Sequence, residues 1–165
     1  MASILSFMTV ILCAVALSEG CSCVTTDHWE ILCRDQFAVQ AEVRKRIGEK
    51  AIKAEARGLT DPDSEKEYEV TIWKKFKGSD RIVTRPFRSG RNPDVHIEER
   101  TNVLTRIGGC GIDLQKGEYY LLTGKIDGES LYINRCGWNV PWASLSAEDL
   151  IALAGFSTAN NCSSS

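Results

Sequence analysis

Two stretches of alternating residues, F-A-V-Q-A-E-V at positions 37–43 and Y-E-V-T-I at positions 68–72, decide the fold class of this chain. In both, aromatic or aliphatic residues stand at every second position, and polar or small residues separate them. Successive side chains of a β-strand point to opposite faces, so this period is typical of strands with one face in a core. The chain is therefore predicted to be mainly β.

Further elements flank these strands. The pattern predicts a strand over 68–78, weaker strands over 81–87 and 103–107, and a strand pair over 119–122 and 131–133 with a turn at Asp127-Gly128. Pro86 suggests an edge strand or a strand end, because proline cannot donate a ladder hydrogen bond. Residues 49–67 are polar and loop-like. Together these elements predict a five- to six-stranded antiparallel OB-like Greek-key barrel.

Short flanking helices are expected, one near the start of the mature chain and one near its end. One spans about 27–34, with Asp27 as its N-cap, and another opens at Ser146. In the second helix, Leu150, Leu153 and Ala154 are expected on the inner face.

Composition places the chain among ordinary globular proteins. It has 165 residues, 43% of them hydrophobic and 25% charged, which argues for one folded domain rather than disorder. The formal net charge of −2 provides no strong field for nucleic acid or an anionic membrane. We find no internal repeat or domain linker, so residues 21–165 are expected to form one domain.

The first 20 residues have the pattern of a secretory signal peptide. Residues 4–17 are almost wholly apolar, and Ser18 and Gly20 are the small residues expected before a cleavage site. No Lys or Arg precedes the apolar run, so an uncleaved signal anchor is the alternative. Cleavage after Gly20 predicts a secreted, extracellular protein whose first residue is Cys21.

The cysteine count fits export. Of seven cysteines, Cys13 leaves with the signal, and six remain at positions 21, 23, 33, 110, 136 and 162. An even number in an exported chain predicts three disulfides, for which fifteen pairings are possible. In an extended chain Cys21 and Cys23 project to the same face, so each is expected to reach a distant partner.

Motifs for catalysis are missing from the sequence. It contains two histidines, His28 and His96, no H-E-x-x-H, no G-x-S-x-G and no phosphate-binding glycine loop. With six cysteines in bridges, no thiol remains as a nucleophile or metal ligand. His28 is expected to be a surface residue. We therefore predict that the protein is not an enzyme; a small secreted hydrolase remains the weakest alternative.

A mature chain that begins with Cys21 has a specific chemical capacity. A free α-amine and the carbonyl of the same residue can form a five-membered chelate with a metal ion, and a catalytic zinc keeps one position open. Disulfides at Cys21 and Cys23 would hold such a terminus rigid in advance. Two alternatives stay open: Cys21 is only half of a disulfide, or it is acylated as in a lipoprotein, although the charge of Glu19 fits that processing poorly.

Five blocks of the sequence resemble the tissue inhibitors of metalloproteinases, specifically their N-terminal netrin-like domain. The segment C-S-C-V at 21–24 resembles the family's C-x-C-V, and Cys33 falls at the family spacing. The segments Y-E-V-T-I-W-K-K-F-K-G at 68–78, C-G at 110–111 and E-Y-Y-L-L-T-G-K at 118–125 match further family segments. The most specific match is C-G-W-N-V-P-W-A-S-L-S at 136–146, which resembles C-x-x-x-x-P-W-x-x-L-S.

This resemblance implies a disulfide pairing and a mode of action. The implied pairs are Cys21–Cys110, Cys23–Cys136 and Cys33–Cys162. The amine and carbonyl of Cys21 would bind the catalytic zinc of a metalloproteinase of the matrix type, in a one-to-one complex with a monomeric inhibitor. The protein would need no cofactor of its own. Residues implied to contact the protease are Cys21, Ser22, Cys23, Val24, Thr25, Ile107, Gly108 and Gly109.

The chain departs from the family pattern in ways that bear on this function. Thr25-Thr26 replace prolines, which would make the N-terminal segment less stiff. Ser22 replaces the more usual Thr and lacks a methyl worth about 0.8 kcal/mol when buried. The second, three-disulfide domain of larger members is not matched. A netrin-like module that binds a receptor or matrix partner without inhibition is the alternative function.

Overall fold

The computed structural model describes residues 21–24, 27–50, 64–88, 97–158 and 162. The predicted signal peptide at 1–20 and Thr25 lie outside these residues. The elements in chain order are α2 (His28–Arg34), β1 (Phe37–Lys50), β2 (Glu65–Lys77), β3 (Arg85–Arg88), β4 (Ile97–Arg106), β5 (Tyr119–Asp127), β6 (Ser130–Tyr132), β7 (Val140–Pro141), a 3-10 turn (Trp142–Ser144) and α3 (Ala147–Thr158). Among the described helices, none has the length and apolar character needed to span a bilayer.

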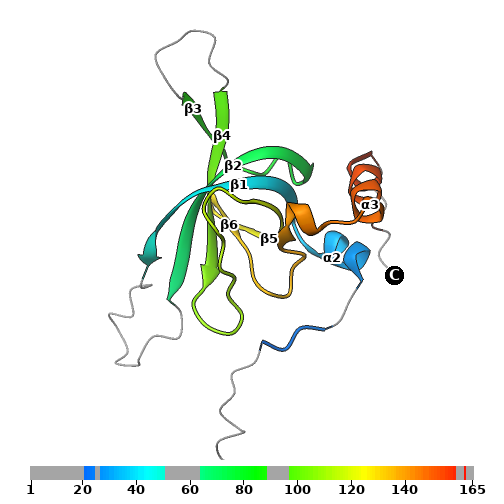
Figure 1. Ribbon diagram of the computed structural model, residues 1–165, viewed down its shortest axis with the longest axis horizontal. Helices are drawn as coiled ribbons and strands as arrows, with labels where there is room; N and C mark the ends of the chain where they lie inside the picture. Colours follow the sequence, from blue (N-terminus) through cyan, green and yellow to red (C-terminus); the bar gives the residue numbers. More distant parts are fainter. Residues whose placement is uncertain (1–20, 25–26, 51–63, 89–96, 159–161, 163–165) are drawn as a thin grey trace, which may run out of the picture.

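Five strands close into a ring, in the order β1, β2, β4, β6 and β5, with β5 pairing back to β1. This confirms the predicted mainly β fold and small closed barrel (Figure 1). The expectation that all pairs are antiparallel is wrong, because β4 and β6 run parallel. A closed ring with an odd number of strands cannot alternate direction all the way round, so one neighbouring pair has to be parallel.

The barrel interior contains the alternating residues. Phe37, Val39, Ala41 and Val43 of β1 are at most 1% exposed. They pack with buried residues of the other strands, namely Tyr68, Val70, Ile72, Val103, Leu122 and Leu131. The strand prediction for both stretches is thereby confirmed.

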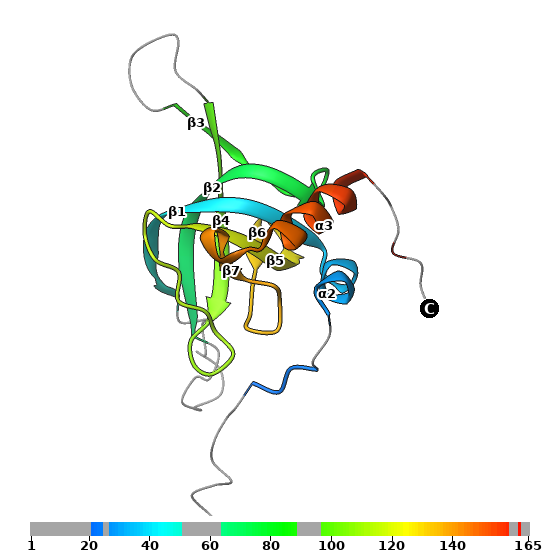
Figure 2. The same ribbon diagram turned by 45° about the vertical axis from the view of Figure 1, so that its right-hand side comes forward.

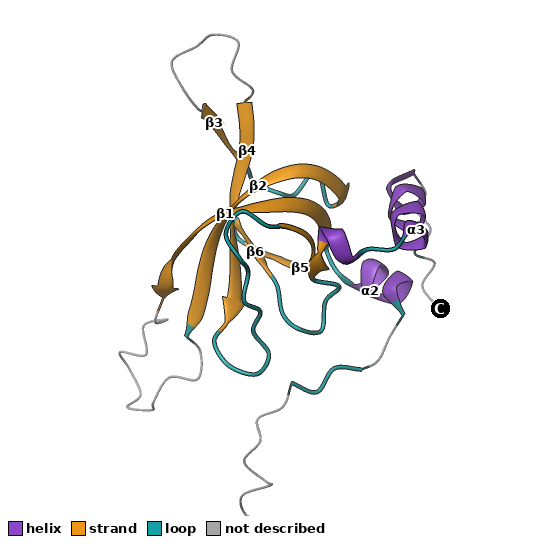
Figure 3. Cartoon of the chain, in the orientation of Figure 1, coloured by secondary structure: helices purple, strands orange, loops and turns teal. Residues whose placement is uncertain are grey.

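A second core lies outside the barrel, beneath the helices. It is formed by residues of α2 and α3, outward-facing residues of β1, β2 and β5, and one tryptophan from the segment before β7. Its members are Ile31, Leu32, Ala38, Phe76, Leu121, Trp138, Leu153 and Phe156. Figure 3 shows α2 and α3 on the same side of the barrel, and Figure 2 shows the same arrangement after a turn of 45°. The helices therefore shield one outer face of the sheet from water.

The helix starts are as predicted. Asp27 caps α2, with its Oδ1 accepting from the amide of Glu30 at 2.8 Å. Ser146 precedes α3, and its Oγ accepts from the amide of Asp149 at 3.1 Å. The expected inner face of α3 is correct only for Leu153, since Leu150 is 39% exposed and Ala154 is exposed. The α3 residues that pack inward are Leu153 and, one turn later, Phe156.

Strand boundaries differ from expectation where the chain leaves the barrel. β4 begins at Ile97 rather than at 103, because its first half pairs with β3 in a hairpin that extends beyond the barrel (Figure 1) and needs no apolar alternation there. β3 starts only at Arg85, since the amides of Arg81 and Ile82 hydrogen-bond to the carbonyl of Gly78 in a turn. β3 pairs with β4 alone, in keeping with the edge position expected from Pro86.

Candidate functional site

The N-terminal segment 21–24, called the ridge below, is extended and bonded to the barrel at two alternate residues. Disulfides join Cys21 to Cys110 and Cys23 to Cys136, with Cα atoms 4.8 and 5.2 Å apart. These pairs, and the third between Cys33 and Cys162, are those that the family resemblance implies. As expected from their spacing, neither Cys21 nor Cys23 bonds to the other.

The ridge exposes the side chain between its two bonded residues and the one that follows them. Cys21 and Cys23 are half-buried, Ser22 is exposed and Val24 is 80% exposed. An isolated valine with this exposure gains nothing from the core, so its apolar surface is available to a partner.

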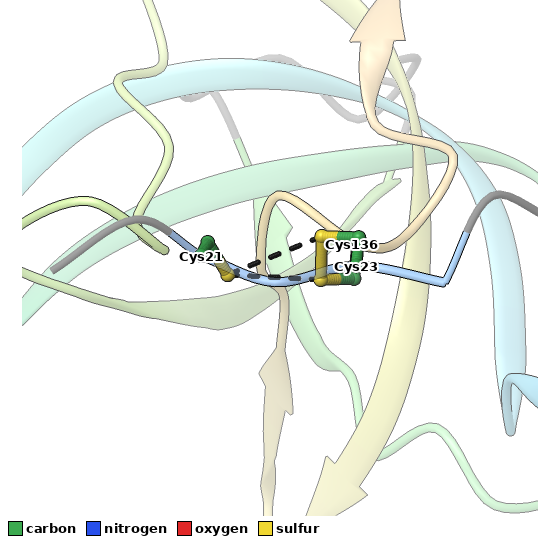
Figure 4. Close-up of side chains that lie close together, drawn as sticks. All are labelled: Cys21, Cys23 and Cys136. Carbon is green, nitrogen blue, oxygen red and sulfur yellow. Dashed lines mark hydrogen bonds between the residues drawn. A yellow bond between two sulfur atoms is a disulfide. The ribbon is translucent and has the colours of Figure 1, made fainter.

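Three sulfur atoms meet under the ridge (Figure 4). The Sγ of Cys21 lies 3.6 Å from that of Cys136 and 4.0 Å from that of Cys23. Three cysteines this close can hold a metal as thiolates, but here all three sulfurs are in disulfides. The cluster is therefore two bridges packed side by side.

The turn that leads from β4 to Cys110 lies beside Cys21. It contains Ile107, which is half-buried, and Gly108 and Gly109, which are exposed. Gly108 has a φ of 105°, a conformation that residues with a side chain rarely adopt. The Cys21–Cys110 bond thus brings together the two segments that the resemblance implies in protease contact.

A second loop, residues 134–139, holds the other end of the ridge and is called the anchor loop below. It contains Cys136, the partner of Cys23. The amide of Arg135 donates to the carbonyl of Cys110 at 2.9 Å, which joins the anchor loop to the partner of Cys21. Sequence reasoning missed Asn134 and Arg135, because they belong to no periodic pattern and carry no motif.

Helix α2 follows the ridge closely and is held against the barrel. Lys77 of β2 donates its Nζ to the carbonyls of Leu32 and Cys33 at 2.7 and 2.9 Å, at the C-terminal end of the helix. Burial lowers the pKa of Lys77, and the nearby carboxylate of Asp35 partly opposes this effect. The helix end is therefore fixed by a cation, which also suits the negative end of the helix dipole.

The contacts of His28 link parts of the fold. Its side chain is 55% exposed, stacks on Trp138 with ring centroids 4.0 Å apart, and places Nδ1 3.3 Å from Asp149. It joins α2 to the anchor loop and to α3, as a surface residue.

The ridge lies outside two surface hollows of the described residues. One surface hollow of about 490 Å³ lies between β2 and β4 near Trp73 and Ile97. Another, of about 460 Å³, is bordered by Lys125 and Tyr132. Neither is lined by a ridge residue. A partly exposed, covalently braced segment is suited to enter the cleft of another protein, whereas a small-molecule site is usually concave.

Comparison with known proteins agrees with this geometry. The family model for "Tissue inhibitor of metalloproteinase" matches residues 19–164. "Metalloproteinase inhibitor 3" of Gallus gallus is 25% identical over 146 residues, which cover 86% of this chain and 58% of that protein. "Metalloproteinase inhibitor 2" of Bos taurus is 24% identical over 131 residues, which cover 79% of this chain and 52% of that protein. The chain thus spans little more than half the length of these two curated relatives.

Proposed function

Because this chain belongs to the tissue inhibitor of metalloproteinase family, we propose that it inhibits zinc metalloproteinases with the mature N-terminus created at Cys21. The family description is that of a protease inhibitor, not of an enzyme. The observation that supports the mechanism best is the ridge itself: it is covalently fixed at Cys21 and Cys23, and the side chains of Ser22 and Val24 are exposed. The protein is proposed to act outside the cell, as a monomer bound one to one to a protease of the matrix type.

The proposed chemistry uses main-chain atoms only. After cleavage between Gly20 and Cys21, the α-amine and carbonyl of Cys21 would take the open position of the protease zinc and displace its water. The amine has to be unprotonated to bind. The unperturbed pKa of an α-amine is about 7.7–8.0, so deprotonation costs only about 1 kcal/mol at pH 7. Inhibition should weaken as the pH falls below that range.

Rigidity of the ridge supports tight binding. A free N-terminal tetrapeptide would lose about 1–2 kcal/mol of backbone entropy per residue on being ordered. Here the bonds to Cys110 and Cys136 impose that order before binding, so less is lost in the complex. Ser22, exposed between the two bonds, is proposed to enter the pocket beside the zinc. Val24 and Thr25 would continue along one side of the cleft, with Ile107 to Gly109 along the other.

The test compares the mature protein with a form that carries one extra alanine before Cys21. Mass spectrometry first establishes the N-terminus and the disulfides of both forms. Inhibition of purified matrix metalloproteinases is then titrated. We expect one-to-one inhibition by the mature form and a loss of at least a hundredfold in the extended form, because its amine is displaced from the chelating position.

A matched control separates chelation from general disturbance of the ridge. Val24→Ala trims an exposed side chain of the ridge and leaves the amine free. It should change inhibition by no more than about fifteenfold, since it removes two methyl groups that contribute about 0.8 kcal/mol each when buried. Full potency of the alanine-extended form would refute chelation. No inhibition by a verified mature form would favour the receptor- or matrix-binding module.

A further inference from the structure

The carboxylate of Asp35, directly after α2, is buried and bonded through both of its oxygens. Its side chain is 7% exposed. Oδ1 accepts from Nε of Arg34 at 3.1 Å, and Oδ2 accepts from the hydroxyl of Thr123 at 2.7 Å. A buried charge is costly unless it is paired and hydrogen-bonded, so this carboxylate needs both partners. Each partner leads to the anchor loop.

The first route runs through Arg34. Its Nη2 donates to the carbonyl of Cys136 at 2.7 Å, while its Nε is held by Asp35. The carboxylate therefore orients the guanidinium toward the main chain of the residue that is bonded to Cys23. Ion pairs of this kind are geometrically specific, because the donors of a guanidinium lie in one rigid plane.

The second route runs through Thr123, which is fully buried in β5. Its hydroxyl donates to Asp35 and accepts from the amide of Trp138 at 2.8 Å. Asp35 thus holds the anchor loop at two points, the carbonyl of Cys136 and the amide of Trp138.

Side-chain amides complete the network within the anchor loop. The amide of Thr123 donates to Oδ1 of Asn139 at 2.8 Å, and Nδ2 of Asn139 donates to the carbonyl of Asn134 at 2.9 Å. The Oδ1 of Asn134 accepts from the amide of Cys136 at 2.9 Å. Both polar main-chain groups of Cys136 are therefore held, one by Arg34 and one by Asn134.

We propose that Asp35 is a positioning residue for inhibition: through Arg34 and Thr123 it fixes the anchor loop, and thereby the ridge bonded to Cys136. This inference rests on the proposed function. The anchor loop also holds the carbonyl of Cys110 through the amide of Arg135, so both disulfides of the ridge depend on it. Loosening the network should let the ridge move without unfolding the barrel.

The first experiment removes the route through Arg34, and urea unfolding first establishes that the variant stays folded although buried Asp35 loses its ion-pair partner. Arg34→Met keeps the unbranched apolar stem of the side chain, which is 47% exposed, but abolishes its hydrogen bonds. The control is Arg85→Met on edge strand β3, which loses a hydrogen bond of 2.9 Å to Asn102, outside the network. Dissociation from a matrix metalloproteinase should become about tenfold faster for Arg34→Met and stay within twofold for Arg85→Met. The association rate should change less than twofold in both.

The second experiment removes the other route and restores it. Thr123→Val keeps the shape of the residue but lacks the hydroxyl, whereas Thr123→Ser retains it. In the uncomplexed protein, hydrogen exchange of the amides of Arg135 and Cys136, which are bonded to Cys110 and Asn134, should be about tenfold faster in Thr123→Val and within twofold of the unsubstituted protein in Thr123→Ser. Neither amide is a partner of Thr123, so a faster exchange reports movement of the anchor loop.

The two experiments separate the inference from the proposed function. If the unsubstituted protein does not inhibit, the proposed function is wrong. Hydrogen exchange in Arg34→Met and Thr123→Val still tests whether the network fixes the anchor loop and the ridge. Unchanged exchange in both variants would overturn the positioning role. If the two variants lose global stability while exchange and dissociation stay unchanged, the network is a purely structural support.

Discussion

Replacing Gly111 by alanine should disrupt the turn that holds Cys21. A Cβ at position 111 would lie 1.7 Å from the carbonyl oxygen of Arg106 and 2.8 Å from its carbonyl carbon. Both are main-chain atoms, so no side-chain rotation can relieve the contact. Ordinary contacts of this type begin at about 3.4 Å, and the two segments would have to separate by at least about 1.5 Å.

The cost follows from the hydrogen bonds that such a separation opens. The amide of Gly111 donates to the carbonyl of Gly108 at 3.0 Å, and the next amide, of Ile112, donates to the buried hydroxyl of Thr105 at 3.1 Å. Each bond contributes about 1 kcal/mol, and an unpaired buried hydroxyl adds about 1–3 kcal/mol. We therefore expect Gly111→Ala to lower the free energy of unfolding by about 3–5 kcal/mol.

Urea unfolding of the oxidised protein measures this loss. Gly48→Ala in β1 is the control, because a Cβ there meets no atom within 4 Å. It should alter stability by no more than about 0.5 kcal/mol. Because Cys110 carries Cys21, Gly111→Ala should also weaken inhibition, and Gly48→Ala should not. A Gly111→Ala protein as stable as the control would refute the close contact on which the reasoning depends.

Three further predictions concern the helices. Leu153→Ala removes a fully buried side chain of α3 and should cost about 2–5 kcal/mol in urea unfolding; a cost below 1 kcal/mol would contradict the second core. Hydrogen bonds from the amide and hydroxyl of Ser146 hold the pKa of Asp149 below its usual value. The ionised carboxylate therefore stabilises the folded protein fully above the unfolded-state pKa, and this stabilisation is lost as the pH falls through the lower folded-state pKa. Asp149→Asn should thus cost about 1 kcal/mol at pH 7 and nothing in strong acid, as acid and neutral melts would show. Replacing Cys33 and Cys162 by serine opens a bridge between residues 129 positions apart, worth about 4–5 kcal/mol in the chain-entropy model, yet inhibition by the folded protein should persist, because the ridge keeps its own two bonds.

Local patterns in the sequence identified most of the elements. The alternation from Phe37 to Val43, the Asp27 cap and the turn after β5 depend on neighbours within four positions, and all three are present in the structure, although the two turn residues are Gly128 and Glu129 rather than Asp127 and Gly128. The same reasoning was wrong where a strand leaves the core. The first half of β4 pairs with β3 through main-chain hydrogen bonds that any sequence can make, so no alternation marks it.

The candidate site was found from sequence in part. Spacing alone showed that Cys21 and Cys23 need distant partners, but it left fifteen pairings open, and the family resemblance was needed to choose among them. The structure then places Cys21 beside Cys110, 89 positions away, and shows the exposure of Ser22 between two bonds.

The sequence by itself determined the strands and helices that bury one face in a core, because such burial requires a short, regular period that can be read along the chain. Only the tertiary structure decided how the ring closes, with β1 on β5 and β4 parallel to β6. It also decided which polar side chains support the ridge. Asp35, Thr123 and Trp138 come from three separate segments, and their hydrogen bonds depend on the positions that the folded barrel gives them. Contacts between such distant residues leave no local pattern, which is why the network could not be predicted from the sequence.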